Sequence, residues 1–177
     1  VYDIIGACSD EASFTLTVNT TPQITNLAAQ EVCVNYILPV IEGTNLSGNE
    51  NYYTDAQANG GTAITNPINT SQQVFIYDQN GACSDEVSFD VMVYDLPEVL
   101  SFSGEGTYCE GDAIDPLNVE VNGVGELTLD YTLDAVNNSV TTNTTSITLG
   151  SAPGVYVLTQ ITDAHCSNTT DFIQTII

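Results

Sequence analysis

The chain has 177 residues, of which 23 are Asp or Glu and one is His, and it contains no Lys or Arg, so its formal net charge is −23. Because no cationic side chain can neutralise phosphate, this composition excludes nucleic-acid binding and electrostatic docking to an anionic membrane. No stretch is apolar for the roughly 18 residues that a membrane-inserted helix needs, yet 42% of the residues are hydrophobic, enough to bury one or two cores.

The first element in the chain is a predicted β-hairpin over residues 1–18. Residues 6–14 read GACSDEASF and recur 75 positions later as GACSDEVSF, over residues 81–89. The apolar alternation that follows, over residues 14–18, recurs as well. Such a long match indicates an internal repeat. We therefore interpret residues 1–18 as the C-terminal hairpin of a truncated Ig-like repeat.

The middle of the chain, residues 19–95, is predicted to be one complete repeat. A proline follows the closing strand at each of its two ends, Pro22 and Pro97. Because proline cannot donate to a strand ladder and has a fixed φ, it suits a short, stiff linker. Between the linkers, apolar runs such as residues 74–77 alternate with turn signals such as Asn-Gly at 80–81.

The last segment, residues 96–177, carries the clearest strand signals. Apolar and polar residues alternate over 127–134, and residues 155–161 are mostly apolar on both faces, as a central strand should be. A weaker third copy of the repeat ends the segment, where Cys166 and a serine precede a closing strand over 171–176.

Turn signals recur about every 8–12 residues along the chain, which is typical of a β-sandwich. No convincing helical period extends over ten residues. We therefore predict an all-β fold of tandem Ig-like β-sandwich domains joined by short Pro-containing linkers.

Five cysteines are present, and the repeat gives each complete domain one early and one late cysteine. A disulfide between the two sheets of a sandwich requires this arrangement. We predict the pairs Cys33–Cys83 and Cys109–Cys166, with the partner of Cys8 upstream of the first residue. Each bond would close a loop of about 50 residues and contribute about 3–4 kcal/mol. Free buried thiols are the alternative, and the wide cysteine spacing matches no zinc pattern.

The middle domain carries the stretches CVNYILP (33–39), YYT (52–54), GGTAI (60–64), INTSQ (68–72), FIY (75–77) and CSDE (83–86). The last domain carries SGEGTYCEGD (103–112), PGVY (153–156) and DAHC (163–166). In this order, the stretches resemble the tandem Ig-like/PKD-like repeats of very large secreted surface proteins of Bacteroidota, including adhesin-type proteins. The resemblance implies an extracellular or cell-surface location. It also implies repeats that carry no catalytic residues and that space a distal module away from the outer membrane.

We predict that the chain is not an enzyme. His165 is the only general base of the usual kind, and it adjoins Cys166, so a Cys–His nucleophile pair has to be considered. A disulfide is the better role for Cys166. Pairs of carboxylates occur by count alone in so acidic a chain and single out no glycosidase site.

Calcium is the one cofactor to consider, because it takes oxygen ligands from carboxylates and amides. The candidate ligands are Asp78, Asp85, Glu86, Asp95 and Glu98, with Asp3, Asp10 and Glu11 as the first-copy cluster. The repeated cluster flanks a hairpin, so its members can converge. Alternatively, residues 78–81 form a hairpin turn without metal, and the acidic side chains protect an exposed sheet edge.

Two features of the sequence point to glycans. Six Asn-X-Ser/Thr triplets are candidate glycosylation sites, namely Asn19, Asn45, Asn69, Asn137, Asn143 and Asn168. Strands rich in Thr and Asn would also produce such triplets without modification. Tyr52 and Tyr53 are neighbours on opposite strand faces, so one ring can point outward to stack on a sugar. The alternative is that this tyrosine covers the core at a sheet edge.

The leading hypothesis is a non-enzymatic, extracellular structural repeat of a surface adhesin, stalk or fibre, whose partners are neighbouring repeats of the same long chain. A second hypothesis is a glycan-binding accessory module of a secreted enzyme. A third is a self-assembling filament subunit, a homopolymer in which the hairpin over 1–18 completes a neighbouring copy by strand complementation.

Overall fold

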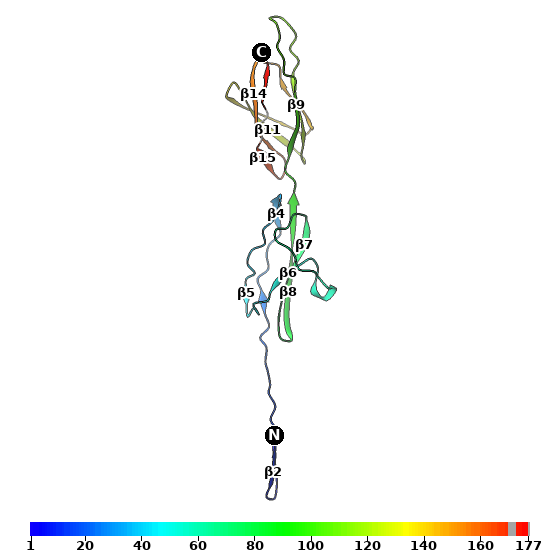
Figure 1. Ribbon diagram of the computed structural model, residues 1–177, viewed down its shortest axis with the longest axis vertical. Coiled ribbons are helices and arrows are strands. Elements are labelled where there is room, and N and C mark those ends of the chain that lie inside the picture. Colours follow the sequence, from blue (N-terminus) through cyan, green and yellow to red (C-terminus); the bar gives the residue numbers. More distant parts are fainter. Residues whose placement is uncertain (170–172, 177) are drawn as a thin grey trace. The chain divides into compact units, whose positions relative to one another are not determined.

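A computed structural model of the chain confirms the all-β fold (Figure 1). The structure describes residues 1–169 and 173–176, so Asp171 and Phe172 of the expected third copy lie outside the described residues. Within these limits, the only helical element is one turn of 3-10 helix, η1 (Gln57–Asn59). No helix in the described part of the chain is long and apolar enough to span a membrane.

Sixteen strands follow one another in the described part of the chain. The first eight are β1 (Tyr2–Ile5), β2 (Cys8–Glu11), β3 (Gln23–Ile24), β4 (Gln30–Cys33), β5 (Gly43–Thr44), β6 (Asn51–Tyr53), β7 (Gln72–Asn80) and β8 (Cys83–Tyr94). The other eight are β9 (Glu98–Ser103), β10 (Leu117–Asn122), β11 (Leu127–Leu133), β12 (Val136–Thr142), β13 (Ser146–Gly150), β14 (Gly154–Thr162), β15 (Ser167–Thr169) and β16 (Ile173–Ile176).

The chain forms two compact units, each made of several segments. Unit 1 comprises Val1–Leu27, Val40–Ile64 and Val74–Phe89, and unit 2 comprises Ala28–Pro39, Thr65–Gln73 and Asp90–Ile177. β7 and β8 contribute residues to both units. The domain boundaries expected from the repeat, 1–18, 19–95 and 96–177, stay predictions.

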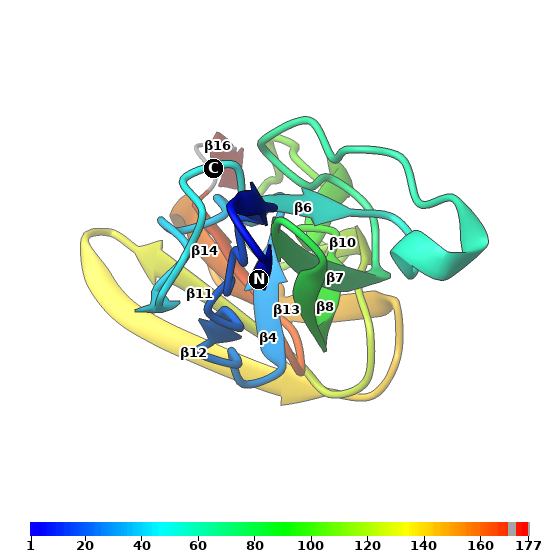
Figure 2. The ribbon, with the colours of Figure 1, turned by 90° about the horizontal axis from the view of Figure 1, so that it is seen from below.

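Most of unit 2 is built from two antiparallel sheets. One sheet has the order β13-β10-β9, and the other has the order β12-β11-β14-β15, with β16 also paired to β14. Figure 2 shows β11, β12 and β14 of the second sheet. The central place of β14, which pairs with three other strands, confirms the interpretation of residues 155–161 as a central strand.

The core of unit 2 lies on one face of each of these sheets. On β10, Leu117, Val119 and Val121 are buried, while Glu120 between them is exposed. This period of two arises because successive side chains of a strand point to opposite faces. Full burial of each such aliphatic side chain contributes about 1.5–3 kcal/mol. The other buried members of the core are Phe102, Leu127, Leu129, Ile147, Tyr156, Leu158 and Ile161.

Unit 1 has the same period-two pattern on a smaller scale. On β7, Val74 and Ile76 are buried, whereas Phe75 and Tyr77 are half-buried on the other face. β7 lies between β8 and β6 in its sheet, and β3 pairs with β5 in a separate short sheet. The ring of Tyr52 packs edge-to-face on Phe89, with 6.4 Å between the ring centroids.

The first 22 residues contrast with the rest of unit 1. β1 and β2 form a hairpin over residues 2–11, shorter than the predicted hairpin over 1–18, with Ile5 opposite Cys8 at the turn. No strand is formed by residues 12–22. The apolar side chains of Phe14, Leu16 and Val18 are 81%, 78% and 81% exposed. These side chains therefore alternate as in a closing strand but lack a core to enter.

Candidate functional site

The candidate site is a disulfide joint within unit 2, and its first half is β4. This strand pairs parallel to the end of β8, with Gln30 opposite Val91 and Cys33 opposite Tyr94. The backbone N–H of Val34 then donates to the carbonyl oxygen of Tyr94 at 2.9 Å. The pairing therefore fixes Cys33 beside the last residue of β8.

The second half of the joint is the turn between β14 and β15, which Asp163 organises. Its carboxylate accepts hydrogen bonds from the backbone N–H groups of Val124 (2.9 Å), His165 (2.8 Å) and Cys166 (2.7 Å). Its own N–H donates to the carbonyl oxygen of Cys166 at 2.9 Å. These bonds hold Cys166 in one position, where it is only 3% exposed.

The buried carboxylate of Asp163 is held in its ionised form. Burial by itself would raise the pKa of Asp163, but the hydrogen bonds from Cys166, His165 and Val124, together with the nearby His165 imidazole, lower it below 3.8, its ordinary value. Hydrogen bonds to a carboxylate favour its charged state. The turn is therefore at its most stable when Asp163 carries a negative charge.

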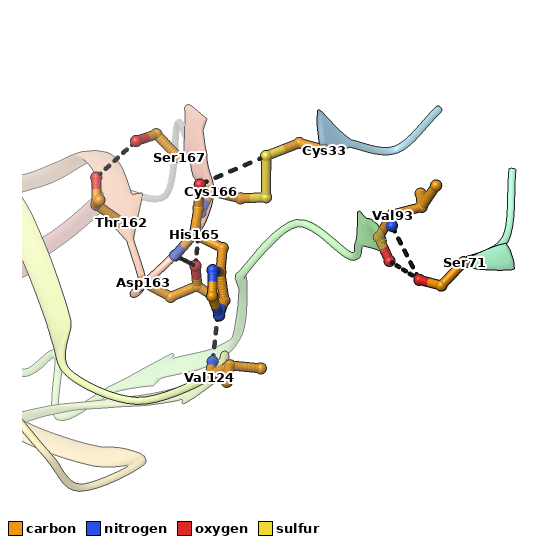
Figure 3. Close-up of a disulfide and its surroundings, with 9 residues drawn as sticks. All are labelled: Cys33, Ser71, Val93, Val124, Thr162, Asp163, His165, Cys166 and Ser167. Atoms are coloured by element: carbon orange, nitrogen blue, oxygen red, sulfur yellow. Dashed lines mark hydrogen bonds between the residues drawn. A yellow bond between two sulfur atoms is a disulfide. The ribbon is translucent and has the colours of Figure 1, made fainter. Parts of the chain in front are cut away.

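A disulfide joins the two halves. Cys33 and Cys166 are bonded across a sequence separation of 133 residues, with 6.0 Å between their Cα atoms (Figure 3). The Cys33 sulfur also lies 3.7 Å from the carbonyl oxygen of His165. Next to the bond, the rings of Tyr94 and His165 stack with 3.7 Å between centroids and 4° between planes. A covalent bond from β4 and a ring stack from the end of β8 thus both attach to the turn between β14 and β15.

The predicted pairs Cys33–Cys83 and Cys109–Cys166 are wrong in this structure. Cys8, Cys83 and Cys109 are free thiols, and Cys33 bonds Cys166. Cys83 begins β8, whereas Cys33 lies opposite Tyr94 at its end, eleven residues further along the same strand. At about 3.3 Å per residue the two ends of β8 are roughly 36 Å apart, and a disulfide needs Cα atoms within about 7 Å.

Cys109 and Cys166 also fail to meet. Cys109 is exposed in the segment between β9 and β10, where its N–H donates to the carboxylate of Asp112 at 3.0 Å. Both the predicted and the observed pairing give one early and one late cysteine to each bond. The observed pairing follows from the parallel pairing of β4 with the end of β8, and no local pattern in the sequence predicts that strand pairing.

The structure gives the middle-domain calcium candidates separate partners. Asp78 is buried and accepts from the N–H (2.8 Å) and the hydroxyl of Ser47. Asp85 accepts from the N–H of Ile24 at 2.7 Å. Glu86 accepts from the N–H of Gln57 at 2.8 Å. Each carboxylate thus binds a different backbone segment.

Asp95 and Glu98 line a shallow pocket in unit 2 together with Val34, Leu96 and Asn122. Across the described residues, no three His, Cys, Asp or Glu side chains gather as a metal site. The side chain of Asp3 lies outside the description, and Asp10 and Glu11 are exposed on β2. A calcium ion stays a prediction.

The six glycosylation candidates differ in exposure. Asn45, Asn69, Asn137 and Asn143 are exposed, whereas Asn19 and Asn168 are half-buried. The side-chain nitrogen of Asn168, the atom to which a glycan would attach, donates to the carbonyl oxygen of Pro97 at 2.9 Å. The four exposed asparagines are therefore the more accessible acceptors, and modification of any of them stays a prediction.

The two neighbouring tyrosines point to opposite faces of β6. Tyr52 is buried against Phe89, whereas Tyr53 is half-buried and contacts Tyr77 edge-to-face at 6.3 Å between centroids. Phe75 lies directly opposite Tyr53 across the β6–β7 pair. Three aromatic side chains, Tyr53, Phe75 and Tyr77, therefore share the outer face of this pair.

No known protein family matches the sequence, and no curated protein matches it significantly. Among solved structures, the chain is similar to the N-terminal eight Ig domains of Down Syndrome Cell Adhesion Molecule. That match has a TM-score of 0.60 and 16% identity, and it covers 99% of this chain but only 26% of that one. It is also similar to an I-band fragment of titin, with a TM-score of 0.51 and 10% identity over 88% of this chain and 63% of that one. At these identities the likeness concerns the fold alone, and it confirms the predicted Ig-like β-sandwich repeats.

Proposed function

We propose that this chain is a non-enzymatic segment of tandem Ig-like repeats from an extracellular surface protein, and that it acts as a load-bearing spacer in an adhesin, stalk or fibre. The observation that carries the proposal is the Cys33–Cys166 bond, which ties β4 to the turn between β14 and β15. Disulfides persist in oxidising compartments, which supports an extracellular location. The absence of Lys and Arg leaves trypsin no cleavage site.

The bond changes the path of a mechanical force through the chain. A force applied at the two ends enters at Cys33 and leaves at Cys166, so the 133-residue separation between them is bypassed. The strands between the two cysteines, β5 to β14, then carry no load while the bond is intact. A spacer that holds a distal module under tension benefits from this arrangement because the strands between the two cysteines cannot be pulled open while the bond is intact.

Single-molecule extension of the whole chain tests the proposal. We expect the oxidised chain to stop short and the reduced chain to release about 440–480 Å of additional contour length, corresponding to the separation of 133 residues. The Cys33→Ser variant should extend fully without reductant. A wild-type chain that reaches the same length with and without reductant would contradict the load-bearing role.

A glycan-binding module is the second candidate, and the outer face of the β6–β7 pair supports it. Tyr53, Phe75 and Tyr77 lie together there and are half-buried. Aromatic faces of this kind can stack on the apolar face of a sugar ring. Saturable binding to an immobilised glycan that Tyr53→Ala abolishes, with Tyr131→Ala as the control on another sheet, would favour this candidate over a plain spacer.

A further inference from the structure

The disulfide joint has three parts, two of which recur elsewhere in the chain. At the joint, Tyr94 ends β8, its ring stacks on His165, and the following residue, Cys166, bonds Cys33 of β4. The parts are therefore the last residue of a closing strand, the late cysteine of the next repeat, and a parallel strand that brings the early cysteine.

Two of these three parts are already in place at a second location, within unit 1. The 75-residue repeat makes Asn19 the counterpart of Tyr94. Asn19 lies against the turn before the late cysteine of the next repeat, because a Cβ on Gly81 would collide with the Asn19 side chain. The Cys83 thiol donates to the carbonyl oxygen of Asn19 at 3.8 Å. The second joint thus has its closing segment and its late cysteine in contact, but Cys83 remains a free thiol.

The missing third part is the parallel strand. At the completed joint β4 pairs with Val91–Tyr94, and Val91 is fully buried. The counterpart of this stretch is residues 16–19, where Leu16 is 78% exposed. A strand laid parallel along residues 16–19 in the register of β4 would place its final residue opposite Asn19. A cysteine there would lie beside Cys83.

We infer that residues 12–19 and Cys83 form the acceptor half of a second disulfide joint. Its occupant is a strand of the β4 type, with a cysteine at the position of Cys33, supplied by the Ig-like repeat of which residues 1–18 are predicted to be the closing hairpin. The inference rests on the proposed function, since it extends one stapled joint into a series of stapled joints. The internal repeat supports it directly, because the equivalent late cysteine, Cys166, is bonded in the same structure.

The bond forms by thiol–disulfide exchange. The Cys83 thiolate attacks the sulfur of a mixed disulfide on the occupant's cysteine, a protein–protein S–S bond forms, and the small thiol leaves and takes up the proton. In total, two protein thiols are oxidised to one disulfide, and the oxidant is a low-molecular-weight disulfide, which is reduced to two thiols. The half-buried position of Cys83 leaves its sulfur open to a strand that lies along residues 16–19.

A peptide-capture experiment on the intact chain tests the inference. The probe is a synthetic peptide with the sequence of residues 28–36 (AAQEVCVNY), its cysteine activated as a thionitrobenzoate disulfide. Release of thionitrobenzoate gives the rate, and mass spectrometry of peptic fragments gives the labelled cysteine. A scrambled peptide of the same composition is the control for intrinsic thiol reactivity.

We expect the β4 peptide to label Cys83 at least about tenfold faster than the scrambled peptide, the effect of a few cross-strand pairs. Cys8 and Cys109 should show no such preference, because neither contacts a segment equivalent to residues 16–19. Leu16→Asp should remove the preference at Cys83. Thr17→Asp adds the same charge to the opposite face of the strand and should leave most of the preference intact.

Equal rates for the two peptides at Cys83, or a preference at Cys109 instead, would overturn the inference. So would oxidation without peptide that joins Cys83 to Cys109 of a second copy, since the occupant would then be another molecule of this chain. The outcome is independent of the extension measurement. If the peptide is not captured, the spacer role of the Cys33–Cys166 bond still stands. If the extension measurement contradicts that role, peptide capture still decides whether Cys83 belongs to a second joint.

Discussion

A nine-residue motif occurs twice in this chain with one substitution, Ala12 for Val87, and its two copies have opposite environments. Phe89 is 4% exposed in the second copy, whereas its counterpart Phe14 is 81% exposed in the first. The local alternation is the same in both. The difference is that β8 has β4 and β7 as neighbours, whereas β2 pairs only with β1 and ends at Glu11. Alternation therefore selects the side chains that can be buried, and partner strands decide whether they are.

The largest expected difference between repeat copies concerns their late cysteines. Cys166→Ser removes a bond across 133 residues, and the loop-entropy relation gives a loss of about 5 kcal/mol in the free energy of unfolding. Cys8→Ser, at the equivalent place in the first copy, should change stability by less than about 0.5 kcal/mol because Cys8 is exposed and free. Urea denaturation of both variants measures the difference. Equal losses would show that the bond does not stabilise the fold.

The two phenylalanines of the repeated motif provide the next test. Phe89→Ala should cost about 3–5 kcal/mol, because it removes a buried ring and leaves a cavity beside Tyr52. Phe14→Ala should stay within about 0.5 kcal/mol, since its ring is exposed. Thermal unfolding of the two variants compares them directly. A large loss for Phe14→Ala would mean that the first copy is packed in solution.

A smaller effect, with a defined pH dependence, is expected at Asp163 of the third copy. Asp163→Asn should cost about 2 kcal/mol at neutral pH, because hydrogen bonds to a charged acceptor are lost. Since the folded pKa of Asp163 is lowered from 3.8, its contribution is complete above that value and disappears as the pH falls through the folded pKa. Unfolding measured between neutral and acid pH should show the two proteins converge. The control is Asp10→Asn, an exposed carboxylate of the first copy, which should match wild type throughout.

The smallest expected effect separates the turn glycines of the two copies. Gly6 and Gly81 both have positive φ, 66° and 61°, so alanine is strained by about 1 kcal/mol at either position. Only at Gly81 would the new Cβ meet a neighbour, the side chain of Asn19. Gly81→Ala should therefore be less stable than Gly6→Ala by up to about 1 kcal/mol. Equal costs would place Asn19 away from the turn in solution.

Local patterns of apolar and polar residues predicted the strands and their buried faces correctly. The alternation over residues 127–134 predicted a half-buried strand, and Leu127 and Leu129 are buried in β11 with Tyr131 and Leu133 at the margin of the core. A register shift between Asp130 and Tyr131 against β14 was not visible in the pattern. Alternation reports which face a side chain occupies, but it does not report a bulge in the partner strand.

The sequence predicted which kind of residue forms the candidate site, but not which two cysteines bond. The cysteines were assigned to disulfides, and two of the four, Cys33 and Cys166, are bonded, but to each other. The roles of Asp163 and of the Tyr94–His165 stack were not anticipated. A short acidic residue three positions before a turn cysteine was the available signal for Asp163, because Asp side chains commonly accept nearby backbone N–H groups.

The sequence by itself determined the all-β class, the repeat and the faces of the strands, because periodicity and self-similarity can be read residue by residue. Only the tertiary structure decided that β4 pairs parallel to the end of β8 rather than placing Cys33 near Cys83. Strand order depends on contacts between residues far apart in the chain, and a disulfide forms only where those contacts bring two cysteines within reach.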